Sequence, residues 1–124
     1  MLVLSHKKLL AWQKAIALVP LIYRFVAGLP PSERFVLGDQ IRRASLSISN
    51  NLAEGCARKS KAEKNRFFEI ARASAVEVDN CLEACLSLRH TTTSDLVSIN
   101  EMLLEIFRLT SGLIASSVLN TEEG

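Results

Sequence analysis

Apolar residues recur along the first part of the chain at spacings of three and four, the period of a helix with one buried face. This pattern predicts a helix from Ser5 to Ala27, with Gly28 as the residue that ends it. The inner face of this helix is expected to consist of Leu9, Trp12, Ile16, Val19, Tyr23 and Val26.

Two further helices are predicted on either side of Gly55. The earlier one runs from Pro31 to Ala53 and ends at Gly55, because glycine readily adopts the positive φ of a helix end. The later one begins at the capping box Ser60-Lys61-Ala62-Glu63 and ends near His90. The inner stripe of the earlier helix is Leu37, Ile41, Ala44, Ile48 and Leu52. The inner stripe of the later helix is Phe67, Ala71, Ser74, Val78, Cys81, Cys85 and Leu88.

A fourth helix is predicted after the polar turn Thr91–Ser94, and it reaches about Asn120. Its inner stripe is Leu96, Ile99, Leu103, Ile106, Leu109 and Leu113. Short connections between amphipathic helices make sequence neighbours antiparallel. The predicted fold class is therefore all-α, an antiparallel up-and-down four-helix bundle that forms a single domain over residues 1–124.

Some apolar residues lie outside these inner stripes. Met102, Phe107, Ile114 and Val118 widen the stripe of the fourth helix, and Phe35, Leu46 and Ala53 form a second stripe on the second helix. Scattered surface hydrophobes are one interpretation. A solitary bundle needs a narrower apolar face, so we favour a subunit interface and predict self-association.

The composition is that of a globular protein, with 48% hydrophobic and 23% charged residues among 124. The net charge of +2 does not by itself require a nucleic-acid partner. No uninterrupted apolar run approaches the roughly 18 residues of a membrane span, so we expect a soluble, cytoplasmic protein with no membrane partner. Three cysteines are an odd number, which favours reduced thiols over a disulfide framework.

The chain offers little for catalysis. Cys81 and Cys85 are four residues apart and could share a metal, but zinc needs more ligands, and His6 and His90 have no paired spacing. Small core residues are the simpler interpretation of the two cysteines. A nucleophile elbow and a glycine-rich phosphate loop are both absent. We therefore expect no enzymatic activity, no metal and no cofactor.

A polar stripe follows one face of the second helix. It consists of Asp39, Arg43, Ser47, Asn50 and Glu54, with Asn51 at its edge toward the core. One interpretation is a structural hydrogen-bond network of Arg43, Ser47, Asn51 and Glu54, which would offset the low helix propensity of the serine and asparagines. The other interpretation is a binding face.

Five cations gather where the second helix passes into the third: Arg58, Lys59, Lys61, Lys64 and Arg66. Lysines at a helix N-terminus oppose the macrodipole, so an external phosphate is one reason for their presence. A more ordinary interpretation is that Arg58 and Lys59 follow the negative end of the second helix and keep the turn solvated. The candidate nucleic-acid-binding residues are these five together with Arg42 and Arg43.

Several motifs carry a resemblance to a known family: Trp12-Gln13-Lys14-Ala15, Gln40-Ile41-Arg42-Arg43-Ala44 and Asn51-Leu52-Ala53-Glu54-Gly55. With them, the chain resembles the four-helix bundle proteins encoded within intervening sequences of bacterial large-subunit ribosomal RNA genes. Ser49 and Ala73 depart from that family's pattern, where proline and glycine are common, and Leu52 replaces isoleucine.

This resemblance implies a closed homo-oligomeric ring, commonly a pentamer. A related branch, the accessory variability determinant of diversity-generating retroelements, binds nucleic acid and a reverse transcriptase through a basic exterior. We therefore expect a non-enzymatic homopentamer that binds the backbone of RNA or DNA without reading sequence. A reverse transcriptase would be a partner if the gene lies in a retroelement. The alternative is a protein scaffold that uses the polar face of the second helix and binds no nucleic acid.

Overall fold

The computed structural model describes the backbone of residues 1–123 and the side chains of residues 1–116. Within this part of the chain all regular structure is helical, which confirms the predicted all-α class. The four long helices are α1 (Leu10–Ala27), α3 (Leu37–Ala57), α4 (Lys61–Ser87) and α5 (Val97–Glu123). The short elements are the 3₁₀ turns η1 (Ser5–Lys8) and η2 (Ser94–Leu96) and the single turn α2 (Pro31–Arg34).

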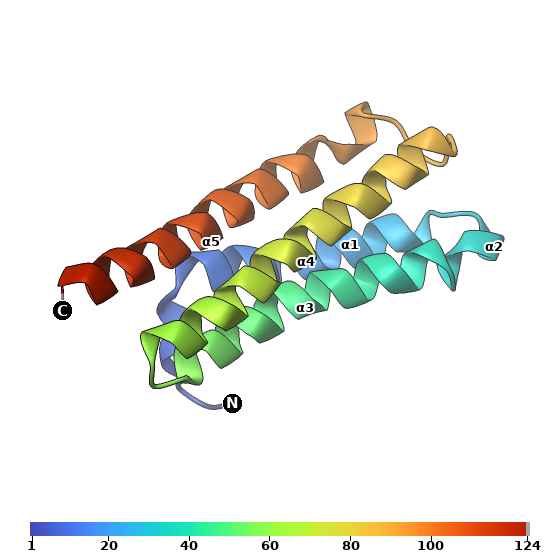
Figure 1. Ribbon diagram of the computed structural model, residues 1–124. Coiled ribbons are helices and arrows are strands. Elements are labelled where there is room, and N and C mark those ends of the chain that lie inside the picture. Colours follow the sequence, from blue (N-terminus) through green and yellow to red (C-terminus); the bar gives the residue numbers. More distant parts are fainter. Residues whose placement is uncertain (124) are drawn as a thin grey trace.

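The four long helices lie side by side along one long axis and form a helical bundle (Figure 1). α3 contacts α1 and α4, and α5 also contacts α1 and α4, so the order around the bundle is α1, α3, α4, α5. The N-terminus and the α3–α4 connection lie at one end, which we call the α3–α4 end (Figure 1). α2 and the α4–α5 connection lie at the other end, which we call the α2 end (Figure 1).

The core is one hydrophobic cluster to which every long helix contributes. On α3 the predicted stripe is confirmed, since Ile41, Ala44, Ile48 and Leu52 are buried and Leu37 packs against the cluster. On α3 the second apolar stripe is thin, with only Leu46 and Ala53 on the helix itself, so the periodicity of the broad stripe determined which side turns inward.

The inner face of α1 differs from the prediction. Its buried residues are Ala11, Ala15, Leu18, Ile22 and Val26, so only Val26 of the predicted stripe is buried. Ile16 and Tyr23 are 41% and 43% exposed, and Trp12 and Val19 are half-buried. Both stripes of α1 are apolar, and the helix turns Ala11 and Ala15, two of its four alanines, toward its neighbours. Alanines on the inner face allow a close approach of helices.

The predicted starts of the first two helices were wrong, as were two of the predicted ends described below. The first helix begins at Leu10 because Leu9 adopts an extended conformation (φ −71°, ψ 124°), which separates it from η1. The second is divided into α2 and α3 because Val36 (φ −111°, ψ −86°) lies outside the helical region. The predicted end of the first helix at Gly28 is confirmed.

Gly55 was expected to end the second helix but lies inside α3, which continues to Ala57. A Cβ atom on Gly55 would lie 2.7 Å from Cε1 and 2.9 Å from Cδ1 of Phe68, and 3.2 Å from Cβ of Phe67. The glycine therefore permits the close approach of α4. Positive φ is not the reason, because none of the glycines in the described backbone has it.

The predicted start of α4 is confirmed, since Oγ of Ser60 accepts a hydrogen bond from the amide of Glu63 at 3.1 Å. The helix ends at Ser87, three residues before the predicted end at His90. There Arg89 adopts φ 61°, and the amides of Arg89 and His90 donate to the carbonyls of Leu86 (3.0 Å) and Cys85 (2.9 Å). These bonds form a Schellman motif, with arginine in the position that glycine usually occupies.

The inner stripe of α4 is confirmed at five positions: Ala71, Ser74, Val78, Cys81 and Cys85. At its two ends the stripe was wrong, because Phe68 is buried in place of the half-buried Phe67, and Leu88 is 54% exposed. Leu88 lies beyond the helix end, where the helical periodicity no longer applies.

On α5 the predicted stripe is confirmed up to Ile106, and the core positions then shift to Thr110 and Ile114. Leu109 and Leu113 are only partly buried. A strict three-four repeat rotates slowly around a straight helix, which explains the shift. The flanking Val118 lies outside the described side chains.

α1 has the length and mean hydropathy (1.3 over Leu10–Ala27) that would allow a helix to cross a membrane, which the sequence reading did not anticipate. Core helices of soluble proteins meet the same criterion. In this structure α1 packs against α3 and α5 and contributes five side chains to the core.

Candidate nucleic-acid interface

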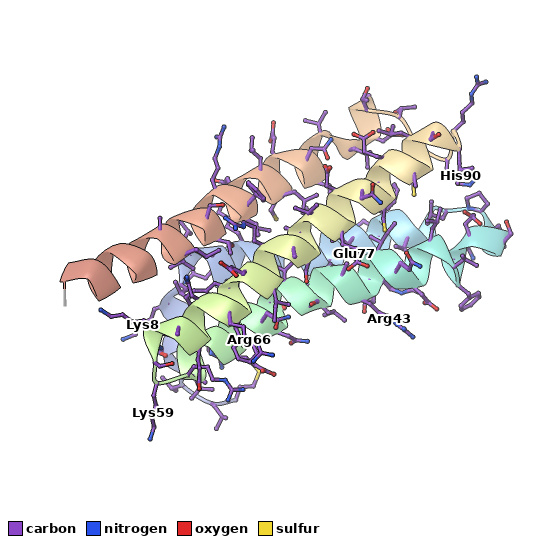
Figure 2. All side chains as sticks on the ribbon, in the orientation of Figure 1. Lys8, Arg43, Lys59, Arg66, Glu77 and His90 are labelled. Carbon is purple, nitrogen blue, oxygen red and sulfur yellow. The ribbon has the colours of Figure 1, made fainter. Side chains whose placement is uncertain are left out.

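The predicted basic turn forms the α3–α4 end of the bundle. Figure 2 shows Lys59 pointing away from the body of the molecule and Arg66 on the first part of α4. Lys59, Lys61 and Arg66 are exposed, and they form no ion pair with the described side chains. Three of the five predicted cations are therefore available to an external anion.

The other two cations of the turn have partners within the chain. Nη2 of Arg58 lies 3.4 Å from Oε2 of Glu54, and the Arg58 guanidinium lies 4.6 Å from the ring centroid of Phe67. Nζ of Lys64 donates to the carbonyl of Cys56 at 3.1 Å. Because that carbonyl belongs to the last turn of α3, Lys64 acts as a cap for the helix C-terminus. These two residues hold the turn together. The more ordinary interpretation named Arg58 but not Lys64, and it expected solvation of the turn instead of these contacts.

Arg42 and Arg43, also predicted to bind nucleic acid, do not join this cluster. Arg42 donates to Asp39 and to the carbonyl of Arg34 (3.1 Å), and its guanidinium lies 5.9 Å from the ring centroid of Tyr23. These contacts tie Arg42 to the α2 end. Arg43 is exposed along α3, away from the basic turn (Figure 2).

Sequence reasoning missed Lys7 and Lys8 as members of the basic end. They belong to η1, which contacts α3, and Lys8 lies at the α3–α4 end (Figure 2). The predicted topology could have indicated them, because in a bundle whose helices alternate in direction the start of the first helix lies beside the end of the second. The α3–α4 end thus combines two basic segments that are distant in sequence.

Charge is distributed unevenly along α4. Its first half holds Lys61, Lys64, Arg66 and Arg72 together with Glu63 and Glu69. Its second half holds Glu77, Asp79 and Glu83 and no lysine or arginine. The basic residues therefore concentrate toward the α3–α4 end, although the net charge of the chain is only +2.

Part of the polar stripe on α3 forms a hydrogen-bonded network with α4. Nδ2 of Asn51 donates to the carbonyl (2.8 Å) and to Oγ (3.0 Å) of Ser47, and Oγ of Ser47 lies 2.8 Å from Oγ of Ser74. Of the predicted members, the structure brings Ser47 and Asn51 together. Arg43 and Glu54 lie apart from them, and Glu54 pairs with Arg58. Ser74 was predicted as an inner residue of α4 but not as a member of the network.

The cysteines lie within or beside the core as free thiols. Sγ of Cys81 lies 3.9 Å from Oε1 of Gln40. Burial raises the pKa of the Cys85 thiol, and the neighbouring Cys81 and Glu33 raise it further. Burial and the nearby Glu77 likewise raise the pKa of Cys81. Both thiols are therefore protonated at neutral pH and poorly suited to nucleophilic chemistry.

The chain is similar to known proteins over most of its length. A family model described as 23S rRNA-intervening sequence protein matches residues 7–112. A crystal structure of a protein of unknown function from the S23 ribosomal protein family of Bacteroides thetaiotaomicron is 26% identical, with a TM-score of 0.78 over 85% of this chain and 95% of that chain. No curated protein matches the chain.

Proposed function

Since the chain belongs to the family of 23S rRNA-intervening sequence proteins, we propose that it is a non-enzymatic protein that self-associates and binds the phosphate backbone of RNA or DNA. The observation that carries this proposal is the basic surface at the α3–α4 end, where Lys59, Lys61, Arg66 and Lys8 are exposed. Lys7 in the same 3₁₀ turn is half-buried, and its Nζ donates to the carbonyl of Leu2. We call these five residues the basic end.

Long cationic side chains suit the phosphate backbone. They neutralise phosphates and release counterions, and this contribution to binding does not depend on the base sequence. Lys59 and Lys61 also flank the N-terminus of α4, where the helix dipole attracts anions. The basic end is therefore suited to backbone binding without base recognition.

Self-association would multiply this charge. The proposed protomer is an antiparallel up-and-down bundle, and the proposed assembly is a closed ring, a pentamer by family resemblance. In a ring whose axis runs along the bundles, every copy presents its basic end on the same side. The summed cations would then produce a stronger field than the net charge of +2 on one chain.

The alternative, a scaffold that binds another protein through the polar face of α3, has less support. Ser47 and Asn51 already use hydrogen-bonding groups within the bundle, and the exposed Glu54 pairs with Arg58. Arg43 and Asn50 are the other exposed members of that face. The retroelement relation and a reverse-transcriptase partner remain predictions. A reverse transcriptase gene beside this one would support them.

The charge reversals Lys59→Glu and Lys61→Glu, made together, test the proposal. Fluorescence anisotropy with a labelled RNA hairpin and a labelled DNA duplex would be measured at about 50 and 200 mM salt. The wild-type affinity should fall steeply with salt. In the double variant the affinity should be lower for both probes, and the slope of log K against log salt should decrease by about 2.

A matched control is the double variant Arg24→Glu and Arg89→Glu, which changes the net charge equally with exposed residues outside the basic end. It should retain most of the affinity. Equal losses in the two variants would show that overall charge, not the basic end, determines binding. Absence of binding by the wild type at low salt would contradict the nucleic-acid proposal.

A further inference from the structure

Apolar side chains gather on the outer face shared by α1 and α3. The contact between the Tyr23 ring and Arg42 shows that the apolar stripe of α1 borders α3. Ile16, Tyr23 and Leu46 are 41%, 43% and 37% exposed. We call this surface the α1–α3 face; its residues are Trp12, Ile16, Val19, Tyr23, Leu46 and Ala53.

A second apolar surface is a groove of about 400 Å³ between α4 and α5, which we call the α4–α5 groove. Val76, Leu104 and Phe107 line it and are 52%, 49% and 40% exposed. Asp79 and Glu83 also line it, and neither forms an ion pair with the described side chains. The groove is thus apolar, with two unneutralised carboxylates.

The two surfaces lie on opposite sides of the bundle, because the order of the helices around it is α1, α3, α4, α5. Exposed apolar patches with polar borders are typical of protein interaction sites. A symmetric dimer through either surface would leave the other one uncovered. A head-to-tail contact, in which each copy uses both surfaces, covers both.

The contacts within the bundle show which residues of the two surfaces lie at the same height along its axis. Lys14 and Glu105 are 3.3 Å apart, so Ile16 is level with Leu104 and Phe107. Likewise, the contact of 2.8 Å between Ser47 and Ser74 makes Leu46 level with Val76.

The same reasoning applies to the charged residues. The contact between Gln40 and Cys81 makes Arg42 level with Asp79 and Glu83. In a ring whose axis runs along the bundles, neighbouring copies meet at equal height. Apolar side chains would then oppose apolar side chains, and the Arg42 guanidinium, which pairs with Asp39 in its own chain, would oppose the two carboxylates of the groove.

We infer that the α1–α3 face of one copy docks head to tail in the α4–α5 groove of a second copy. Ile16 and Leu46 pack against the apolar lining of the groove, and Arg42 faces Asp79 and Glu83. This inference rests on the self-association proposed above and names the two surfaces that carry it.

Cysteine cross-linking tests the contact. Leu46→Cys and Val76→Cys are made separately, each with the half-buried Cys56 replaced by serine, and are oxidised alone and as an equimolar mixture. The mixture should form a disulfide-linked dimer on a non-reducing gel, and neither variant alone should do so. Ala17→Cys, exposed on α1 outside the face, should not link to Val76→Cys.

The outcomes separate the inference from the proposal on which it rests. Light scattering of the wild type at micromolar concentration first establishes whether the protein self-associates; a monomer would contradict the proposed function itself. If the wild type assembles but Val76→Cys links to itself, or the mixture does not link, the head-to-tail contact is wrong while self-association stands.

Charge insertion provides an independent measurement. Ile16→Glu and Leu104→Glu should each prevent assembly, because each damages one surface of every copy. Mixed together, they should form a one-to-one dimer and nothing larger, since the mixture holds one intact face and one intact groove. Assembly of Ile16→Glu into the wild-type oligomer would contradict the inference.

Discussion

Two regions of the molecule differ from the usual distribution, in which large apolar residues are buried and polar residues are exposed. One is the contact between α3 and α4, and the other is the outer face of α1. Between α3 and α4, the buried or half-buried positions include Gly55, Ser47 and Ser74. On the outer face of α1, the large side chains Ile16 and Tyr23 remain substantially exposed. In these two regions burial therefore follows helix proximity more closely than hydrophobicity, although the core as a whole is hydrophobic.

The physical reason is the space between the backbones. Small residues let α3 and α4 approach closely, and the hydroxyls and the amide of the network satisfy one another within that contact. Large apolar residues on the outside gain nothing from the monomer fold beyond partial packing. They are available to a second copy, which is the basis of the inferred docking contact.

The largest effect is expected at Gly55. Gly55→Ala would place a Cβ atom 2.7 Å from the Phe68 ring and 3.2 Å from Cβ of Phe67, so α4 or the ring must shift. Overpacking of this kind costs about 1–3 kcal/mol, against a gain in helix propensity of about 1 kcal/mol. We expect a net loss in the free energy of unfolding of up to about 2 kcal/mol, measured by urea denaturation.

Gly112→Ala is the matched control, because a Cβ atom on Gly112 has no neighbour within 4 Å. It should stabilise α5 by about 0.5–1 kcal/mol through helix propensity alone. If both substitutions were stabilising, the close approach of α4 to Gly55 would be wrong. The explanation given above for the α3–α4 contact would then be wrong as well.

Two predictions from the sequence were wrong: the role of Gly55 and the inner stripe of α1. A glycine near the expected end of a helix is typical of a C-cap, and only the position of Phe68 reveals that close packing requires it instead. α1 is apolar on two sides, so periodicity could not choose between them. On α3, where one apolar stripe is broad and the other thin, the inner stripe was predicted correctly.

The candidate site was predictable in part for similar reasons. A run of cations marks the α3–α4 connection in the sequence, and the capping box correctly placed the start of α4. The partners of Arg58 and Lys64 depend on a ring and a carbonyl positioned by the fold. The placement of Lys8 and Lys59 at the same end of the bundle depends on how distant segments meet there (Figure 2).

A smaller effect is expected within the network. Asn51→Ala removes the two hydrogen bonds that Nδ2 donates to Ser47, at 2.8 Å and 3.0 Å. The expected loss is about 1 kcal/mol in the free energy of unfolding, with the oligomeric state unchanged. Thermal unfolding with light scattering on the same sample would measure both. Unchanged stability would refute a structural role for the polar stripe.

The smallest effect is expected at Glu54, which lies one turn beyond Asn51 but on the exposed side of α3. Its partner Arg58 lies 3.4 Å away, at the spacing of an i,i+4 helix pair. Such exposed pairs contribute about 0.3–0.5 kcal/mol, and salt screens them. Glu54→Gln should therefore change the free energy of unfolding by no more than about 0.5 kcal/mol. At about 1 M salt the variant and the wild type should have the same free energy of unfolding. A loss as large as that of Asn51→Ala, insensitive to salt, would contradict this prediction. It would show that Glu54 belongs to the hydrogen-bonded network of Ser47, Asn51 and Ser74. Because the two variants lie on the same helix and differ mainly in burial, their difference measures how much of the polar stripe contributes to the α3–α4 contact.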